Sequence, residues 1–162
     1  MRKREEKITI REYDHIQELD ESARELLLAA RGIVNQAYAP YSNFKVGAAI
    51  RLDDGTIVKG NNQENAASPT GTCAERSALF WANANFPDRR VMAIAITAID
   101  QDDKRAVNLS PCGTCRQALM EAQFRFKQRI EIILDSRSKI EVLDGIDQLL
   151  PLSFSADSLQ SE

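Results

Sequence analysis

The segment from Val91 to Ile99 constrains the fold more than any other part of the sequence, because almost every side chain in it is apolar. A strand with one exposed face alternates apolar and polar residues, whereas a strand covered on both faces is apolar throughout. Helical spacing of apolar residues predicts helices over 21–37, 73–84 and 112–124. Further strands are predicted over 45–52, 56–60, 130–134 and 140–143. Helices alternating with strands around a buried strand predict a three-layer α/β/α fold with a central mixed sheet of about five strands.

The chain organisation is simple. A length of 162 residues predicts one domain over 1–162. Residues 1–18 are expected to form an N-terminal arm, in which Ile8, Ile10 and Tyr13 give a weak strand signal. The Asp-Gly pair at 54–55 predicts the turn of a hairpin between the strands at 45–52 and 56–60.

Composition narrows the classes of function. Hydrophobic residues make up 43% and charged residues 28% of the chain, as in soluble globular proteins. No apolar run approaches the ~20 residues that span a bilayer, and residues 1–6 do not begin a secretory signal, so a cytoplasmic protein without membrane partners is expected. The net charge of −3 argues against binding to nucleic acid. A single histidine, His15, excludes a multi-histidine metal site within one chain.

Three cysteines, Cys73, Cys112 and Cys115, all fall at the predicted starts of helices. The positive end of a helix dipole stabilises thiolates there, and thiolates are the form that binds zinc. One cysteine plus a C-x-x-C pair supplies three ligands and no evident fourth. Structural zinc sites usually have four protein ligands, whereas catalytic sites keep one position for water. The pattern therefore favours one catalytic Zn²⁺ per subunit, although buried or redox-active cysteines are the alternative.

Two charged residues follow the first cysteine. Glu75 lies two residues after Cys73, where its carboxylate can stand beside a metal-bound water and move protons. Arg76 lies one helical turn after Cys73, and we expect its guanidinium to withdraw charge from the thiolates and so tune the zinc. A Cys-x-Glu sequence upstream of Pro-Cys-x-x-Cys is a described signature of zinc base deaminases.

Five segments together resemble the small zinc-dependent cytidine deaminases that act on free nucleosides. Their residue ranges are 37–49, 62–66, 73–76, 111–117 and 149–154. The resemblance implies a cytidine-deaminase-like fold in which Cys73, Cys112 and Cys115 hold zinc. It implies hydrolysis of cytidine and deoxycytidine to uridine and deoxyuridine with release of ammonia, a reaction of pyrimidine salvage. A zinc-bound hydroxide would attack C4 of the base, and Glu75 would shuttle the protons.

The resemblance also implies a nucleoside site. Asn62 and Glu64 would bind the ribose 3′-hydroxyl, although the residues alone favour a loop that caps itself. Phe44 would pack against the base or sugar. The Ala74 amide would donate to the base O2, and the Ser110 carbonyl would accept from the amino group at C4.

Assembly is implied by the resemblance alone. The family forms homotetramers with shared active sites, in which Phe154 would reach into a neighbouring subunit's site. One departure is Ser68, in a small, polar stretch where the family usually has a tyrosine or another bulky residue. Ser68 keeps open the alternative of a modified or antibiotic cytosine nucleoside as substrate.

Two less favoured alternatives remain. A polynucleotide cytosine deaminase would use Arg125, Lys127 and Arg129, which are interleaved with Phe124 and Phe126. These cations are instead expected at a helix C-terminus, where the dipole favours them. A non-catalytic zinc module would need neither Glu75 nor the ribose pair.

Overall fold

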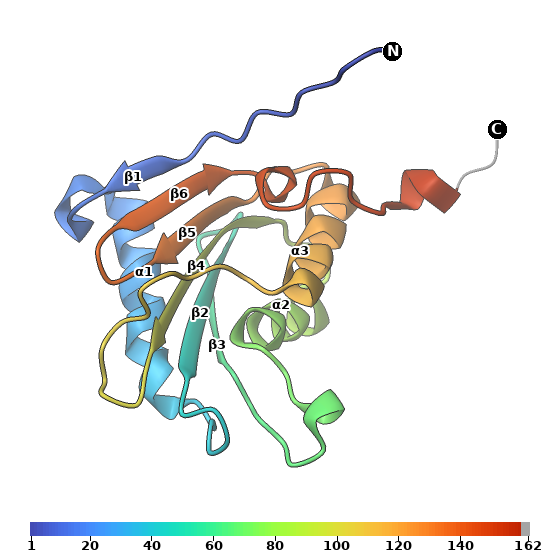
Figure 1. Ribbon diagram of the computed structural model, residues 1–162. Helices are drawn as coiled ribbons and strands as arrows, with labels where there is room; N and C mark the ends of the chain where they lie inside the picture. Colours follow the sequence, from blue (N-terminus) through green and yellow to red (C-terminus); the bar gives the residue numbers. More distant parts are fainter. Residues whose placement is uncertain (160–162) are drawn as a thin grey trace.

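A computed structural model describes residues 1–159 and contains one six-stranded mixed sheet in the order β1-β6-β5-β4-β2-β3 (Figure 1). The strands are β1 (Arg11–Tyr13), β2 (Lys45–Leu52), β3 (Ile57–Asn61), β4 (Val91–Ile99), β5 (Glu131–Asp135) and β6 (Ile140–Asp144). β4 and β5 run parallel, and the other neighbouring pairs are antiparallel. The sheet therefore changes from antiparallel to parallel pairing at β4.

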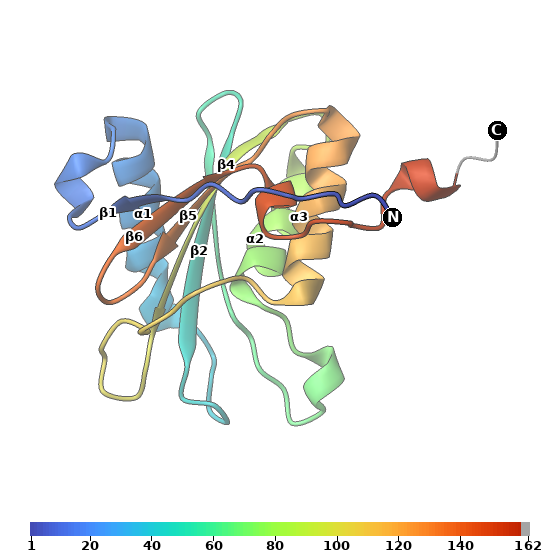
Figure 2. The ribbon, with the colours of Figure 1, turned by 45° about the horizontal axis from the view of Figure 1, so that its top comes forward.

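Helices cover both faces of the sheet, which gives the predicted three layers. α1 (Glu21–Ile33) lies on one face, and α2 (Ala74–Asn85) and α3 (Gly113–Phe126) lie on the other (Figures 1 and 2). β4 supplies Ile94 and Ile96 to the core under α2 and α3, and Ala93 and Ala95 to the core under α1. Its apolar character follows from this double burial.

The predicted elements are confirmed with small changes of boundary. α1 ends at Ile33 and continues as a 3₁₀ turn over Val34–Gln36, so the α-helix is shorter than the predicted 21–37. The structure has six strands against about five expected, because β1 pairs with the edge of β6. Of the residues that gave the weak strand signal in the arm, Tyr13 lies in β1, whereas Ile8 and Ile10 lie outside it and are exposed. Among residues 1–159, no helix has both the length and the apolar character needed to cross a lipid bilayer.

Glycine at position 60 places α2 against the sheet. A Cβ atom added at Gly60 on β3 would lie 2.5 Å from the backbone nitrogen of Ala78 and 2.7 Å from the carbonyl oxygen of Ala74. Both distances are far below van der Waals contact, so a side chain would push the helix away. The first turns of α2, and with them Cys73, are held close to the sheet for this reason.

Candidate metal centre and pocket

Three thiols meet where α2 and α3 begin. Cys73 and Cys112 are the residues immediately before the two helices, and Cys115 lies in the first turn of α3. The Sγ atom of Cys112 lies 3.8 Å from that of Cys73 and 3.5 Å from that of Cys115. Tetrahedral Zn–S bonds of ~2.3 Å place neighbouring sulfurs ~3.8 Å apart. The three side chains therefore fit a zinc ion, and within residues 1–159 they are the one cluster of cysteine, histidine and carboxylate groups with this capacity.

The thiols differ in burial and in acidity. Burial raises the pKa of Cys115, which is fully buried, and Glu75 raises it further. Burial also raises the pKa of Cys73. Burial opposes ionisation of Cys112 too, but hydrogen bonds from the backbone and side chain of Cys115 outweigh it and lower the pKa of that thiol. Thiols with a raised pKa hold their protons more tightly, and zinc must displace these protons to bind. The affinity for zinc should therefore rise with pH.

Glu75 lies beside this cluster in the first turn of α2. Its side chain is almost completely buried, and this burial raises the pKa of its carboxyl group. Glu75 lines a cavity of about 710 Å³ whose wall also includes Cys73 and Cys112. A carboxyl group with a raised pKa at the base of a cavity is suited to accept and return protons near neutral pH.

Arg76 lines the same cavity. Contact with the Cys73 sulfur, and secondly with Cys115, raises the pKa of its guanidinium despite the cost of burial. Its Nε atom is buried and finds no hydrogen-bond partner within residues 1–159. Arg76 therefore lies next to the thiols, and its tuning of the zinc stays a prediction.

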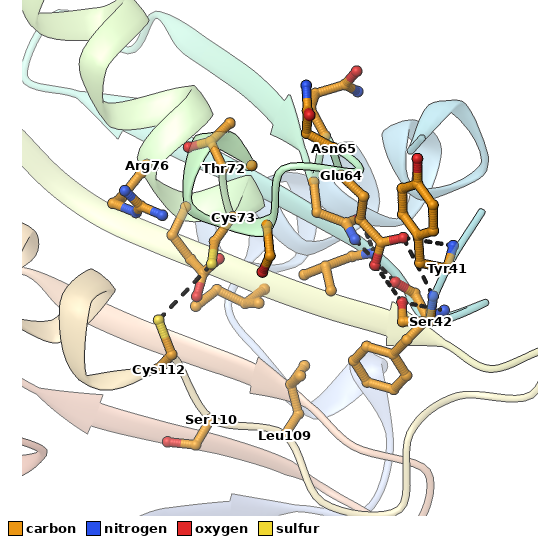
Figure 3. A pocket seen from close by; sticks show the side chains of 18 of the residues that line it. Tyr41, Ser42, Glu64, Asn65, Thr72, Cys73, Arg76, Leu109, Ser110 and Cys112 are labelled. Atoms are coloured by element: carbon orange, nitrogen blue, oxygen red, sulfur yellow. Dashed lines mark hydrogen bonds between the residues drawn. The ribbon is translucent and has the colours of Figure 1, made fainter. Parts of the chain in front are cut away.

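Glu64 lies at the far end of the cavity from Cys73 and Cys112 (Figure 3), and Asn62 lines the same cavity. Oε1 of Glu64 accepts a hydrogen bond from the Ser42 hydroxyl, and Oε2 accepts from the backbone nitrogens of Tyr41 at 2.9 Å and Ser42 at 3.3 Å. The Ser42 hydroxyl, followed by the Tyr41 amide, lowers the pKa of Glu64, so this carboxylate is ionised at neutral pH.

Asn62 bridges the start of β2. Its Oδ1 accepts from the Val46 nitrogen at 2.8 Å, and its Nδ2 donates to the Phe44 carbonyl at 2.9 Å. The loop does cap itself, as the residues alone suggest. Each amide atom nevertheless retains a second hydrogen-bonding position that could face a ligand.

The remaining predicted site residues divide into two groups. Phe44 and Ser110 line the cavity, and Ala74, the first residue of α2, is fully buried behind Cys73. Phe154 does not line this cavity. It lines a separate cavity between α2 and α3, its side chain is exposed, and its carbonyl accepts a hydrogen bond from Gln117 at 2.9 Å.

Sequence reasoning gave no role to two residues that organise the site. Arg116 donates to the Pro111 carbonyl, the Leu149 carbonyl and the Ser110 hydroxyl, each at 2.8 Å, and so fixes the chain before α3. Ser42 holds Glu64, as described above. An arginine directly after C-x-x-C was a signal for the first, and a serine two residues before Phe44, typical of a serine turn, was a signal for the second.

Comparison with known proteins places these features in a family. Residues 20–128 match the family model described as the cytidine and deoxycytidylate deaminase zinc-binding region. A cytidine deaminase of Halalkalibacterium halodurans is 39% identical over 129 residues, which cover 76% of this chain and 86% of that protein. A cytidine deaminase of Mycobacterium tuberculosis is 36% identical over 126 residues, covering 78% of this chain and 84% of that protein.

Solved structures agree with the sequence comparisons. The crystal structure of a cytidine deaminase from Burkholderia pseudomallei superposes with a TM-score of 0.68 and 38% identity, covering 80% of this chain and 97% of that one. The cytidine deaminase from Bacillus anthracis, at 22% identity and a TM-score of 0.65, supports the fold alone. The part of this chain that precedes the family match, residues 1–19, includes β1.

Proposed function

The chain belongs to the cytidine deaminase family, and on this premise we propose which of its residues bind the metal, transfer protons and bind the substrate. The protein is a zinc-dependent cytidine deaminase, which hydrolyses cytidine to uridine and ammonia. The observation that carries this conclusion is the juxtaposition of three zinc-compatible thiols with the buried Glu75 at the base of one cavity.

Cys73, Cys112 and Cys115 would hold the zinc ion as thiolates. When bound, zinc supplies a water molecule that is acidic enough to act as a nucleophile near neutral pH. Glu75 takes the proton of the attacking water and passes it to N3 of the base as the new C4–O bond forms. Glu75 then takes the remaining proton from the new C4 hydroxyl and delivers it to the 4-amino group. The C4–N bond breaks, the C4 carbonyl of uridine forms and ammonia leaves. One carboxyl group thus serves as base and then as acid.

Arg76 would balance the charge of the metal centre. Three thiolates and Zn²⁺ sum to −1, which weakens the metal as a Lewis acid. The guanidinium beside Cys73 and Cys115, together with the N-termini of α2 and α3, would withdraw electron density from the sulfurs.

The opposite end of the cavity would bind the sugar. Glu64 and Asn62 would hold the ribose 3′-hydroxyl with the hydrogen-bonding positions that the loop leaves free. Phe44 would pack on the base or sugar. The Ala74 amide would donate to O2, and the Ser110 carbonyl would accept from the amino group. The cavity's length from thiols to Glu64 supports this division into a base end and a sugar end.

The substrate range would include deoxycytidine, consistent with pyrimidine salvage in the cytoplasm. Ser68 lines the cavity, and its small side chain supports a second candidate, a cytosine nucleoside with a substituted base or sugar.

We further propose that residues 1–162 act as one deaminase domain in a homotetramer, in which Phe154 contributes to a neighbour's site. Phe80 and Trp81 on α2, each with 53% of its surface exposed, and Phe154, with 59% exposed, support an apolar contact between subunits.

The test is conversion of cytidine by purified protein with its zinc content measured. We expect one zinc ion per chain and production of uridine and ammonia in equal amounts, detected by chromatography and an ammonia assay. A zinc-loaded protein that leaves cytidine unchanged but deaminates a substituted cytosine nucleoside would favour the second candidate.

A further inference from the structure

Ser42 joins the two segments that form the sugar end of the cavity. Its hydroxyl donates to Oε1 of Glu64 and accepts from the backbone nitrogen of Phe44 at 3.0 Å. A serine hydroxyl has one proton to donate. Because the Phe44 amide occupies an acceptor position of Ser42, the Ser42 proton is directed at Glu64.

The contacts of Glu64 leave room for one ligand hydroxyl. An ionised carboxylate has about four acceptor positions. Three donors, the Ser42 hydroxyl and the Tyr41 and Ser42 amides, occupy three of them. Glu64 is thereby held in one orientation with a single remaining position toward the cavity, which it lines.

Phe44 has a second, independent support. Asn62 donates to its carbonyl at 2.9 Å, and β2 begins immediately afterwards at Lys45. Loss of the Ser42 hydroxyl would therefore remove the donor to Oε1 of Glu64 while leaving the backbone of Phe44 in place. The two amide donors to Oε2 would remain, but nothing would fix Oε1.

Resting on the proposed role of Glu64 in sugar binding, we propose that Ser42 is a positioning residue for nucleoside recognition. Its hydroxyl aligns the Glu64 carboxylate with the 3′-hydroxyl of the substrate. Ser42 touches neither the base nor the metal ligands in this role. Its contribution is to binding and not to the chemical step, so its loss should raise KM and leave kcat nearly unchanged.

The experiment combines a substitution in the protein with a deletion in the substrate. Steady-state kinetics of zinc-loaded wild type and Ser42→Ala are measured with cytidine and with 3′-deoxycytidine, which lacks the hydroxyl that Glu64 would bind. Ser138→Ala, in the exposed β5–β6 turn, is the matched control for loss of a serine hydroxyl. Thermal midpoints and zinc content of the three proteins show that each is folded and loaded.

For wild type, we expect kcat/KM to be at least about tenfold lower with 3′-deoxycytidine than with cytidine, since Glu64 is left unpaired. Ser42→Ala should lose about tenfold in kcat/KM for cytidine, through KM, and less than about twofold for 3′-deoxycytidine. Ser138→Ala should match wild type with both substrates.

Two results would overturn parts of this account, and they are distinguishable. If Ser42→Ala lost kcat/KM equally with both substrates, or with neither, Ser42 would not act through the 3′-hydroxyl contact. The proposed role of Glu64 would be unaffected by that result. A wild-type enzyme that uses both substrates equally well would overturn the proposed role of Glu64 itself, and the role of Ser42 with it.

Discussion

Two buried carboxyl groups lie on opposite faces of the same sheet and have opposite acidities. Asp135, at the end of β5 on the α1 side, is fully buried, and Glu75, at the start of α2 on the other side, is almost so. The pKa of Asp135 is lowered, whereas burial raises the pKa of Glu75. Burial alone therefore does not decide the state of a carboxyl group; the donors around it do.

Both carboxylate oxygens of Asp135 accept two hydrogen bonds each. Arg31 donates to both carboxylate oxygens at 2.8 Å, the Thr97 hydroxyl donates to Oδ2 at 2.8 Å, and Arg105 donates to Oδ1 at 2.9 Å. Burial favours the neutral acid, but these hydrogen bonds and charges outweigh it and lower the pKa. Asp135 is therefore an anion at neutral pH, and it joins α1 to β4 and β5.

The surroundings of Glu75 are different in kind. The groups nearest to it in the metal centre are sulfurs, which are weak hydrogen-bond partners, and Arg76, whose strongest contact is with Cys73. One sheet thus supports two kinds of carboxyl group. Asp135 has a full set of donors and stabilises the fold, whereas Glu75 has fewer donors and can exchange protons.

Removal of the metal should have the largest effect, and only on the α2–α3 side. Substituting the buried Cys115 by serine removes one of three thiolates, so we expect zinc content well below one per chain and no measurable turnover. Zinc is measured by mass spectrometry and turnover by cytidine absorbance. Stoichiometric zinc with full activity in Cys115→Ser would contradict the assignment of this ligand.

Asp135→Asn should reduce stability strongly without affecting the chemistry. It leaves Arg31 and Arg105 without their shared anion, and we expect a loss of about 2–4 kcal/mol in the free energy of unfolding by urea. Turnover per folded, zinc-loaded chain should stay near wild type.

The matched control for this loss is Glu131→Gln on the same strand. Glu131 pairs with Arg11 at 2.8 Å, but 51% of the Arg11 side chain is exposed. Such a pair contributes less than about 1 kcal/mol. Equal losses of stability in the two variants would contradict the special status of Asp135.

Arg76→Gln should affect the metal centre but not the α1 side. We expect zinc affinity or turnover to fall by about 10–100-fold, as for other groups that contact metal ligands. Competition with a chromogenic chelator measures the affinity, and cytidine absorbance measures the turnover. Unchanged zinc affinity together with unchanged turnover would exclude the proposed role of this guanidinium.

Acid should produce the smallest of these effects. At low pH, wild type and Asp135→Asn should differ less in their free energy of unfolding than at neutral pH. Because the pKa of Asp135 is lower in the folded protein than in the unfolded chain, its contribution is complete above pH ~4 and is lost as pH falls through the folded-state pKa.

Urea unfolding of both proteins between pH 7 and 3 should therefore show their difference shrinking by about 1 kcal/mol. Both proteins release zinc in acid, so the contribution of the metal cancels in the difference. A difference that stays constant or grows would show that Asp135 is not the titrating group.

The sequence predicts most of the fold and the metal centre, but it does not predict contacts between distant segments. Doubly buried β4 and the helix periodicity were sufficient to predict the three layers, because a strand that is buried on both faces is almost entirely apolar. β1 was predicted only weakly and with the wrong bounds, because a three-residue edge strand depends on pairing with β6, about 130 residues away in the chain. Local alternation cannot report such a partner.

In the metal centre, the spacing of Cys73, Glu75 and the C-x-x-C pair places all four side chains at the starts of two helices. Their proximity could therefore largely be predicted from the sequence. The roles of Ser42 and Asp135 could not be inferred, because each depends on contacts between separate segments. Ser42 contacts Glu64 across 22 positions, and Asp135 contacts Arg31 across 104. Their residue types are common on surfaces, and even the serine-turn signal at Ser42 does not identify Glu64 as its partner.

The most direct test of the central claim is the ultraviolet absorbance of cytidine incubated with zinc-loaded wild type and with zinc-loaded Glu75→Gln. The substitution keeps the size of the side chain and removes its ability to carry protons. We predict conversion to the uridine spectrum with wild type and a rate lower by about 10²–10⁴-fold with Glu75→Gln at equal zinc content. A variant that converts cytidine at the wild-type rate would contradict the assignment of Glu75 as the proton carrier.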